Sequence, residues 1–276
     1  MSRHWFLTGA SSGIGRHLAE IILASGDDLT ATVRRPETLD DLAARYGDQL
    51  VVERLDVTVK GDIAPVVQRA EARRPVDVLV NNAGGGIIGA TEEFSDADIE
   101  GQISLNLLAP VHVTRAFILA MRTRRAGRII QISSASGQGS LPTSSLYHAA
   151  KWGLEGFSEC LRQELEGFGV FVTLIEPGGA RTSFSRNLQY ALENPAYQDT
   201  PAGQIRAMFE NAGDELYTLD PQKIAHRIFD TATSEKPPLR VALGGDAFGV
   251  IQAALKGRLS ALEAQESLAR SVAFDS

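Results

Sequence analysis

The sequence predicts an α/β fold with a doubly wound parallel sheet of about seven strands, and two observations support this prediction. Short runs rich in apolar and β-branched residues alternate with segments of helical period. Repeated strand–helix units of this kind form a parallel sheet with helices on both faces, because their crossovers are right-handed. The expected strands are residues 5–8, 29–33, 51–56, 76–81, 128–133, 170–176 and 239–243.

The segments between the strands carry apolar residues on one helical face, which is the second observation. Residues three and four positions apart lie on the same side of a helix. These faces are expected to cover the sheet, so a ligand is expected beyond the carboxyl ends of the strands. The clearest faces are Ile14, Leu18, Ile21 and Ile22 in the first helix, and Leu154, Phe157, Leu161 and Leu165 in a later one.

Length and composition indicate one large domain over residues 1–276. The chain is 43% apolar and 22% charged, and it has no low-complexity run and no repeat at a fixed period. Its net charge of -7 argues against a nucleic-acid partner, because binding to phosphates requires a concentrated basic surface.

Cysteine content and apolar runs indicate the compartment. Cys160 is the single cysteine, so neither an internal disulfide nor a cysteine-based metal site is expected, and the histidines show no metal-ligand spacing. The apolar runs are shorter than the roughly 20 residues of a membrane span. Only four residues precede the first run, which leaves no room for a signal peptide. We therefore expect a cytoplasmic protein with no metal and no membrane partner.

The turn after the first strand has the pattern of a phosphate-binding loop. Its glycines have the spacing G-x-x-x-G-x-G and stand between a strand and a helix. Glycine lets backbone N–H groups approach a pyrophosphate, and the helix amino terminus adds partial positive charge. A tight turn that only reverses the chain is the alternative. The residues expected to contact a nucleotide are Gly9, Ser11, Ser12, Gly13, Ile14 and Gly15.

The ends of the second and third strands indicate which nucleotide is bound. Arg34 and Arg35 stand where an NAD-selective site has a carboxylate, and a guanidinium there favours a 2′-phosphate. NADP(H) is therefore the preferred cofactor, and NAD(H) is the alternative. Arg35 also fits a surface arginine that opens the next helix. Asp56, followed by Val57, either accepts a hydrogen bond from the adenine amino group or caps the next turn.

The fourth strand and the helix after it add small and polar residues. Asn82, Ala83 and Gly84 follow the strand and suit either a close approach to a ribose or a structural turn. Asn106 lies within an apolar helical face, and a buried asparagine must be hydrogen-bonded. Its amide is therefore either structural or holds a water molecule.

A serine, a tyrosine and a lysine have the spacing needed to move a proton. Ser134 follows the fifth strand, and Tyr147 and Lys151 are four residues apart on one helix face. A phenol titrates near pH 10, so it needs a nearby ammonium to stabilise its anion before it can act near neutrality. Ser134 would then polarise a substrate oxygen, Tyr147 would exchange its proton, and a nicotinamide would exchange a hydride with the carbon.

In this combination the chain resembles the short-chain dehydrogenase/reductase family from residue 5 to about residue 182. The glycine turn matches that family's cofactor motif, and the Asn82 turn matches its strand-four motif. Ser134 stands thirteen residues before the tyrosine of the Tyr-x-x-x-Lys motif. The departures are Ala150, where many relatives have serine, and the extra glycines Gly85 and Gly86. Neither departure removes a reacting group.

This resemblance implies a Rossmann-type oxidoreductase with an active-site tetrad. Asn106 would hold a water that links Lys151 to a proton relay, and Tyr147 would be the general acid or base. Lys151 would also contact the nicotinamide ribose, and Asp56 and Asn82 would contact the cofactor. The family also implies a homodimer or a homotetramer. The tetrad is Asn106, Ser134, Tyr147 and Lys151, and the residues that would receive the nicotinamide end are Pro177, Gly178 and Thr182.

Two segments outside the motifs are assigned by pattern. Residues 183–218 are expected to form a substrate-binding flap, whose apolar residues either grip a hydrophobic substrate or pack within a two-helix insertion. Residues 247–276 are expected to form a C-terminal helical segment, whose apolar face packs on the core or on another subunit. The apolar residues of the flap are Phe184, Leu188, Tyr190, Leu192, Tyr197, Met208 and Phe209.

The predicted function is therefore the interconversion of a carbonyl and an alcohol on a hydrophobic small molecule, with NADP(H) as the hydride carrier. One alternative is a catalytically silent NADP-binding regulator, and the complete tetrad argues against it. The other is an epimerase that retains its nicotinamide cofactor.

Overall fold

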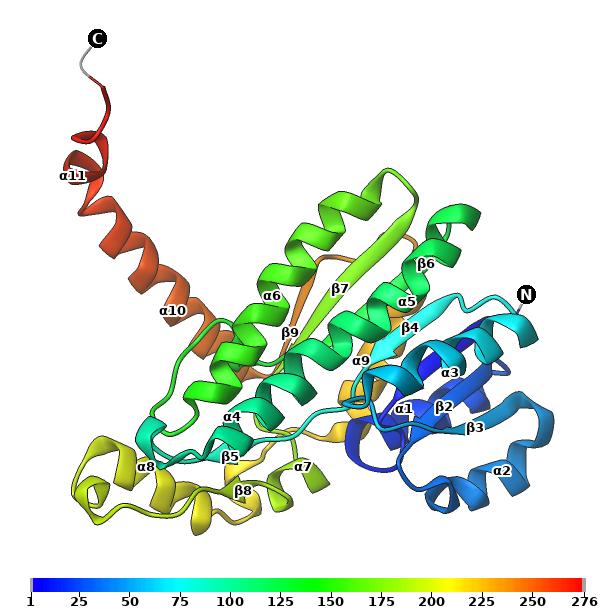
Figure 1. Cartoon of the computed structure of the whole chain (residues 1–276), viewed down its shortest axis with the longest axis horizontal. Coiled ribbons are helices and arrows are strands. Elements are labelled where there is room, and N and C mark those ends of the chain that lie inside the picture. The colour runs from blue at the N-terminus through cyan, green and yellow to red at the C-terminus, as the bar shows by residue number, and fades with distance from the viewer. Residues whose placement is uncertain (1, 275–276) are drawn as a thin grey trace.

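The computed structural model of the chain describes residues 2–274 and contains the expected parallel sheet (Figure 1). Its strand order, β3-β2-β1-β4-β6-β7-β9, confirms a doubly wound sheet of seven strands. Every neighbouring pair is parallel, and the strand order reverses between β1 and β4. A ligand crevice is expected at that reversal. The strands are β1 (His4–Thr8), β2 (Asp28–Val33), β3 (Leu50–Arg54), β4 (Val78–Asn81), β6 (Gly127–Ile132), β7 (Val170–Pro177) and β9 (Arg240–Leu243).

Two strand ends differ from the expected ones by two residues, because a side chain redirects the backbone, and the other differences are of one residue. β3 ends at Arg54 rather than at residue 56, since Asp56 accepts hydrogen bonds from the backbone N–H and the hydroxyl of Thr58 and turns the chain. β4 begins at Val78 rather than at residue 76. Asp77 just before it binds His4 through both its backbone and its carboxylate.

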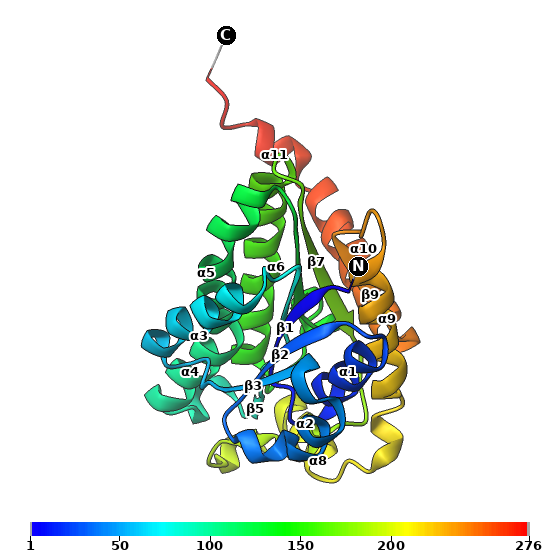
Figure 2. The same cartoon turned by 90° about the vertical axis from the view of Figure 1, so that its right-hand side faces the viewer.

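Helices cover both faces of the sheet (Figure 2). Side chains of one strand alternate between these faces, so Trp5 packs in one apolar core and Phe6 in the other, with its ring centroid 4.9 Å from that of Phe117. The apolar faces predicted from the sequence are the ones that pack inward, with Leu18 and Leu161 both buried. The helices are α1 (Gly13–Ala24), α2 (Asp40–Tyr46) and α9 (Pro221–Thr233) on one face, and α3 (Lys60–Arg73), α5 (Ala109–Arg124) and α6 (Ser145–Glu166) on the other.

The remaining elements are a small second sheet, further helices and 3₁₀ turns. A second, two-stranded sheet joins β5 (Ile87–Ile88) to β8 (Gln189–Tyr190). The remaining helices are α4 (Asp96–Ile103), the π-helix η4 (Ser104–Leu108), α7 (Ser183–Arg186), α8 (Pro201–Glu210), α10 (Gly245–Glu263) and α11 (Glu266–Arg270). The 3₁₀ turns are Pro36–Leu39, Gly47–Gln49, Thr91–Glu93, Ala135–Gly137, Pro195–Tyr197 and Asp214–Leu216.

One described helical run, Asp96–Arg124, is long and apolar enough to cross a membrane by length and composition. It joins α4, η4 and α5 over 29 residues. The expectation that apolar runs are shorter than a membrane span was made for uninterrupted runs, and this helical run is interrupted by polar residues. In the fold this run covers the sheet, and Val113, Phe117 and Met121 are fully buried against it. Core helices of other folds have the same length and hydropathy, so the run carries no membrane assignment.

The C-terminal helix α10 extends away from the body of the molecule (Figure 1). Its first turn is anchored by the buried Ala247, but Leu255, Leu259 and Leu262 are 51%, 56% and 67% exposed. The apolar face predicted for this segment therefore does not pack on the core. Packing on another subunit stays a prediction.

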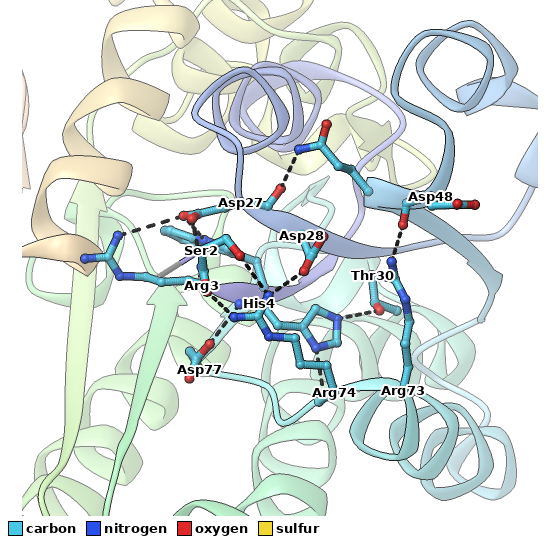
Figure 3. Close-up of polar contacts among 12 residues, drawn as sticks. Ser2, Arg3, His4, Asp27, Asp28, Thr30, Asp48, Arg73, Arg74 and Asp77 are labelled. Carbon is cyan, nitrogen blue, oxygen red and sulfur yellow. Dashed lines mark hydrogen bonds and ion pairs between the residues drawn. The ribbon is translucent and has the colours of Figure 1, made fainter.

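A polar network closes the amino-terminal edge of the sheet (Figure 3). His4 is fully buried, and its Nδ1 lies 2.8 Å from the carbonyl oxygen of Arg74 while Nε2 lies 2.9 Å from the hydroxyl of Thr30. Because a carbonyl only accepts, Nδ1 carries the proton and Nε2 accepts from Thr30. The backbone N–H of His4 donates to Asp77 at 2.8 Å, and Arg74 pairs with Asp28. These contacts tie β1 and β2 to the segment that enters β4.

This network predicts a pH-dependent contribution of His4 to stability. Burial lowers the pKa of His4 from its ordinary value of 6.5, so between the two values the unfolded chain binds more protons than the folded one. The contribution is therefore present above pH 6.5 and is lost as the pH falls through the lowered value. We expect His4→Gln to lower the free energy of unfolding by about 2 kcal/mol above pH 6.5, and by less at acidic pH. Urea unfolding of both proteins across this pH range measures the difference.

The comparison with His4→Gln removes the contributions of other titrating groups, which are common to both proteins. His226→Gln, at an exposed position on α9, is the matched control and should follow the wild-type protein at every pH. A deficit in His4→Gln that stays constant with pH would contradict the role assigned to the buried ring.

Candidate active site

A cavity of about 840 Å³ lies beyond the carboxyl ends of the strands, at the reversal of strand order. The turn after β1, the ends of β2, β3, β4, β6 and β7, and the segment after Thr182 contribute to its wall. This is the position expected for a ligand in a doubly wound sheet. Most of the sequence-predicted residues line it, and the exceptions are Gly15, Arg35 and Asn106.

The turn after β1 is held tightly against the end of β4. The side-chain amide of Asn82 donates to the carbonyl oxygens of Thr8 and Gly9, both at 3.0 Å. Gly9 has a φ of +70°, a conformation that favours glycine. A Cβ at Gly15 would overlap the Gly9 carbonyl oxygen and the Asn82 amide nitrogen, so only glycine fits there. The turn thereby directs the amino terminus of α1, which begins at Gly13, toward the cavity.

The structure separates the roles expected at the ends of β2 and β3. Arg34 is exposed and lines the cavity, whereas Arg35 is exposed, lies outside the lining and opens a 3₁₀ turn with its carbonyl. Asp56 also lines the cavity, but one of its oxygens caps the turn by binding Thr58. These hydrogen bonds lower the pKa of Asp56, and the charge of Arg34 lowers it further. Asp56 is thus an anion beside a cation at the cavity edge.

Ser134, Tyr147 and Lys151 come together at the centre of the cavity wall. Tyr147 lies in the first turn of α6 and is hydrogen-bonded to Ser134, which follows β6. One turn further along α6, Lys151 is buried, and its Nζ donates to the carbonyl oxygen of Ile132 at 2.8 Å. Its Nζ also lies 5.6 Å from the centroid of the Tyr147 ring. A hydroxyl, a phenol and an amine thus face one space.

Burial changes the acidity of both titrating groups. It raises the pKa of Tyr147 to about 12, while the hydrogen bond to Ser134 acts in the opposite direction. It lowers the pKa of Lys151 to about 8, while the charge of Glu155 raises it. Tyr147 is therefore a protonated phenol at neutral pH in this structure. The nearby Lys151 therefore does not bring the pKa of Tyr147 near neutrality, which differs from the expectation based on spacing alone.

Asn106 occupies a π-helical turn, an irregularity that often marks functional sites. Its Oδ1 accepts from the N–H of Gly85 at 3.3 Å, and its Nδ2 donates to the carbonyls of Gly85 and Gln102 at 2.9 and 3.2 Å. These hydrogen bonds hold the extended turn after β4, so the amide has a structural role, which is one of the two roles left open by the sequence. The link through water to Lys151 stays a prediction.

Residues 183–218 lie beside the cavity and are attached through β8 to β5. Phe184, Leu188 and Phe209 line the cavity, and the Phe184 ring centroid lies 5.9 Å from that of Tyr147. The Ser183 hydroxyl donates to that of Ser12 at 2.7 Å, which ties the start of this segment to the turn after β1. The other apolar residues expected to grip a substrate lie outside the lining, and they are Tyr190, Leu192, Tyr197 and Met208.

Asp246 and Glu155 are two residues of this region that the sequence reasoning missed. Asp246, at the start of α10, lines the cavity and accepts from the N–H of Gly179 at 2.7 Å. No motif indicates this contact, because it joins segments 67 residues apart. Glu155 follows Lys151 by one helical turn, and this spacing was a usable signal.

Comparison with known proteins identifies the family. Residues 3–193 match the family model of short chain dehydrogenases. The chain is 35% identical over 250 residues to oxidoreductase BOA17 of Botryotinia fuckeliana, covering 90% of each protein. It is 34% identical over 248 residues to human retinol dehydrogenase 8, covering 85% of this chain and 79% of that protein. The chain therefore belongs to the short-chain dehydrogenase/reductase family.

Solved structures agree with this assignment. A short-chain dehydrogenase from Streptomyces avermitilis superposes with a TM-score of 0.90 at 38% identity, over 99% of this chain and 98% of that one. A closed form of serine dehydrogenase complexed with NADP⁺ superposes with a TM-score of 0.73 at 29% identity, over 87% and 93% of the two chains.

The packing at Gly15 predicts a strict requirement for glycine. Gly15→Ala should lower the free energy of unfolding by about 1–3 kcal/mol, because the added methyl group has to displace backbone or the Asn82 amide. Gly61→Ala, in α3 with open space around the added atom, is the control and should be neutral or stabilising. Urea denaturation of the three proteins measures this, and equal effects of the two substitutions would refute the close packing.

Proposed function

We propose that this protein is an NADP(H)-dependent oxidoreductase that interconverts a carbonyl and an alcohol on a hydrophobic small molecule. The observation that carries the proposal is that Ser134, Tyr147 and Lys151 share one cavity of about 840 Å³ with the glycine turn after β1. Hydride transfer to a carbonyl needs a bound nicotinamide and a proton donor in the same space. Membership of the short-chain dehydrogenase family supports the same reaction class.

The residues around the turn fit a dinucleotide. Gly9 and Gly15 pack against the turn after β4 with no room for a side chain, which keeps the turn after β1 tight and leaves the amino terminus of α1 at the cavity to meet a pyrophosphate. When bound, the nicotinamide supplies or accepts the hydride at the reacting carbon. Arg34 is the proposed partner of a 2′-phosphate. The other proposed contacts are Ser11, Ser12, Gly13, Ile14, Asp56, Val57, Ala83, Gly84, Lys151, Pro177, Gly178 and Thr182.

The proposed proton donor is Tyr147. Its raised pKa keeps the phenol protonated at neutral pH, so it can donate to a carbonyl oxygen that Ser134 also holds. The Lys151 ammonium then stabilises the phenolate left by this donation. In the reverse direction the phenolate accepts the proton of an alcohol. Asn82 and Asn106 act by positioning the turns after β1 and β4.

The lining of the outer cavity supports a hydrophobic substrate. Phe184, Leu188 and Phe209 come from the segment 183–218, which we propose as the substrate flap, and Leu105 and Leu141 add apolar surface to the same lining from other segments. Retinol dehydrogenase 8, one of the relatives, is named for an apolar alcohol. We further propose that the protein works in the cytoplasm as a homo-oligomer, with the exposed apolar residues of α10 at a subunit contact.

Replacement of Tyr147 tests the reaction and the proton donor together. Purified wild-type protein should oxidise NADPH with members of a panel of hydrophobic ketones, aldehydes, steroids and quinones, as followed by nicotinamide absorbance. Tyr147→Phe should lower kcat about 10²–10⁴-fold while NADPH affinity is unchanged, because only the transferable proton is lost. Tyr197→Phe, outside the cavity lining, is the control. Substantial turnover by Tyr147→Phe would exclude it as the donor.

Replacement of Arg34 tests the choice of nucleotide. Arg34→Asp should shift the ratio of kcat/KM from NADPH toward NADH, because the carboxylate repels a 2′-phosphate and accepts from a 2′-hydroxyl. Arg35→Asp makes the same charge change outside the cavity lining and should leave the ratio nearly unaltered. The assignment is wrong if both variants change the ratio equally.

A further inference from the structure

Helix α6 continues the catalytic face beyond Lys151. Glu155 follows Lys151 by four residues and Tyr147 by eight, so the three side chains share one side of the helix. Glu155 is only 4% exposed, and its charge acts on Lys151. It lies outside the cavity lining, so it cannot touch a substrate there.

Glu155 meets a second buried carboxyl group at the end of β7. Glu176 is 2% exposed, and the side-chain amide of Gln138 donates to both groups, at 3.2 Å to Glu155 and 3.4 Å to Glu176. Arg240 of β9 also reaches both, with its Nε 2.9 Å from Glu155 Oε2 and 3.5 Å from Glu176 Oε1. Four segments of the chain thus meet around two carboxyl groups.

This cluster contains more carboxyl groups than its cation can neutralise. Arg240 also pairs with Glu159, at 3.1 Å, so one guanidinium serves three carboxyl groups. Two ionised carboxylates side by side in a buried site repel each other, and such a pair holds a proton more strongly than either group alone. Burial and the charge of Glu155 raise the pKa of Glu176 to about 7. The shorter contact of Glu155 with Arg240 favours Glu155 as the ionised member.

We propose that Glu155 and Glu176 form a carboxyl pair that shares one proton, and that the single negative charge of this pair keeps Lys151 in its ammonium form. Both are positioning residues, because they act on the reaction through Lys151. The effect on catalysis rests on the proposed function. The protonation states of the pair and of Lys151 are measurable without any substrate.

Lys151 needs this counter-charge because its other contacts do not supply one. Its Nζ donates to a neutral carbonyl, that of Ile132, and faces the ring of Tyr147, which is uncharged at neutral pH. Burial lowers the pKa of Lys151 to about 8, and Glu155 acts against this loss. A neutral amine would leave the phenolate of Tyr147 without its stabilising charge.

The remaining charged neighbours lie on the outer side of the pair. Glu159 stands one turn beyond Glu155 on α6 and is more exposed. Arg258 of α10 binds the backbone carbonyl of Gln138 at 2.5 Å and its side-chain oxygen at 3.3 Å. Arg258 thus reaches the pair only through Gln138, and Arg240 is the cation in direct contact.

The titration of Lys151, followed by NMR of lysine-labelled protein and assigned with Lys151→Gln, tests the proposal. Glu155→Gln should move the titration to lower pH by about one unit, because the nearest negative charge is removed. Glu159→Gln removes another carboxylate that pairs with Arg240 and is the matched control, expected to leave the titration unchanged. Equal titration of Lys151 in the wild-type protein and in Glu155→Gln would overturn the proposal, whatever happens to the melting temperature.

The shared proton is tested separately by infrared spectroscopy of the wild-type protein. A protonated carboxyl band that titrates at about pH 7, above the range in which ordinary carboxyl groups titrate, should be present in the wild-type protein and absent from Glu176→Gln. Because glutamine resembles the protonated acid and Glu155 keeps its charge, Glu176→Gln should shift the titration of Lys151 much less than Glu155→Gln does. Absence of the band from the wild-type protein overturns the pair, and this measurement decides even if Glu155→Gln does not fold.

The kinetic consequence separates this proposal from the proposed function. The acidic limb of kcat/KM for NADP⁺-dependent alcohol oxidation should move to higher pH in Glu155→Gln, because the phenolate of Tyr147 loses stabilisation. A wild-type protein with no turnover counts against the proposed function alone. The titration of Lys151 and the infrared carboxyl band still test the carboxyl pair in that case.

Discussion

The hydrogen bonds from the Asn82 amide to the carbonyl oxygens of Thr8 and Gly9 are the constraint on which the binding edge of the sheet depends. They join the end of β4 to the turn after β1 across the reversal of strand order. Gly15 packs so closely on both that no side chain fits, and this sets the direction of α1. The cavity takes its floor from this arrangement, and Ser183 attaches the flanking segment to the same turn.

The second half of the site depends on burying charge along α6. A buried lysine and a buried carboxyl pair are costly, because removal from water disfavours each ionised form. Arg240 and Gln138 offset part of that cost around Glu155 and Glu176. Within the described residues, the Ser133 hydroxyl and Glu155 Oε1 are buried without a hydrogen-bond partner.

At the amino ends of the strands, in contrast to α6, the buried titratable side chain is neutral and fully hydrogen-bonded. There the buried His4 has a partner on each ring nitrogen, and Asp77 satisfies its backbone. A neutral, fully hydrogen-bonded ring helps to hold β1, β2 and the entry to β4 together, and the ionised groups beside it, Asp77 and the Arg74–Asp28 pair, are themselves partnered. The His4 network thus lies at the amino ends of the strands and the cavity at their carboxyl ends. Ligands of doubly wound parallel sheets bind at the carboxyl ends.

The sequence by itself determined the seven parallel strands and most of the predicted site residues that line the cavity, because alternating periodicity and glycine spacing are local properties of the chain. Only the tertiary structure distinguished Arg34 from Arg35 and showed that Asn106 binds Gly85. It also brought Glu155 against Glu176 and Arg240, and it left the apolar face of α10 off the core. These features depend on which distant segments come into contact and on how far each side chain is removed from water. The local pattern of residues predicts neither of these.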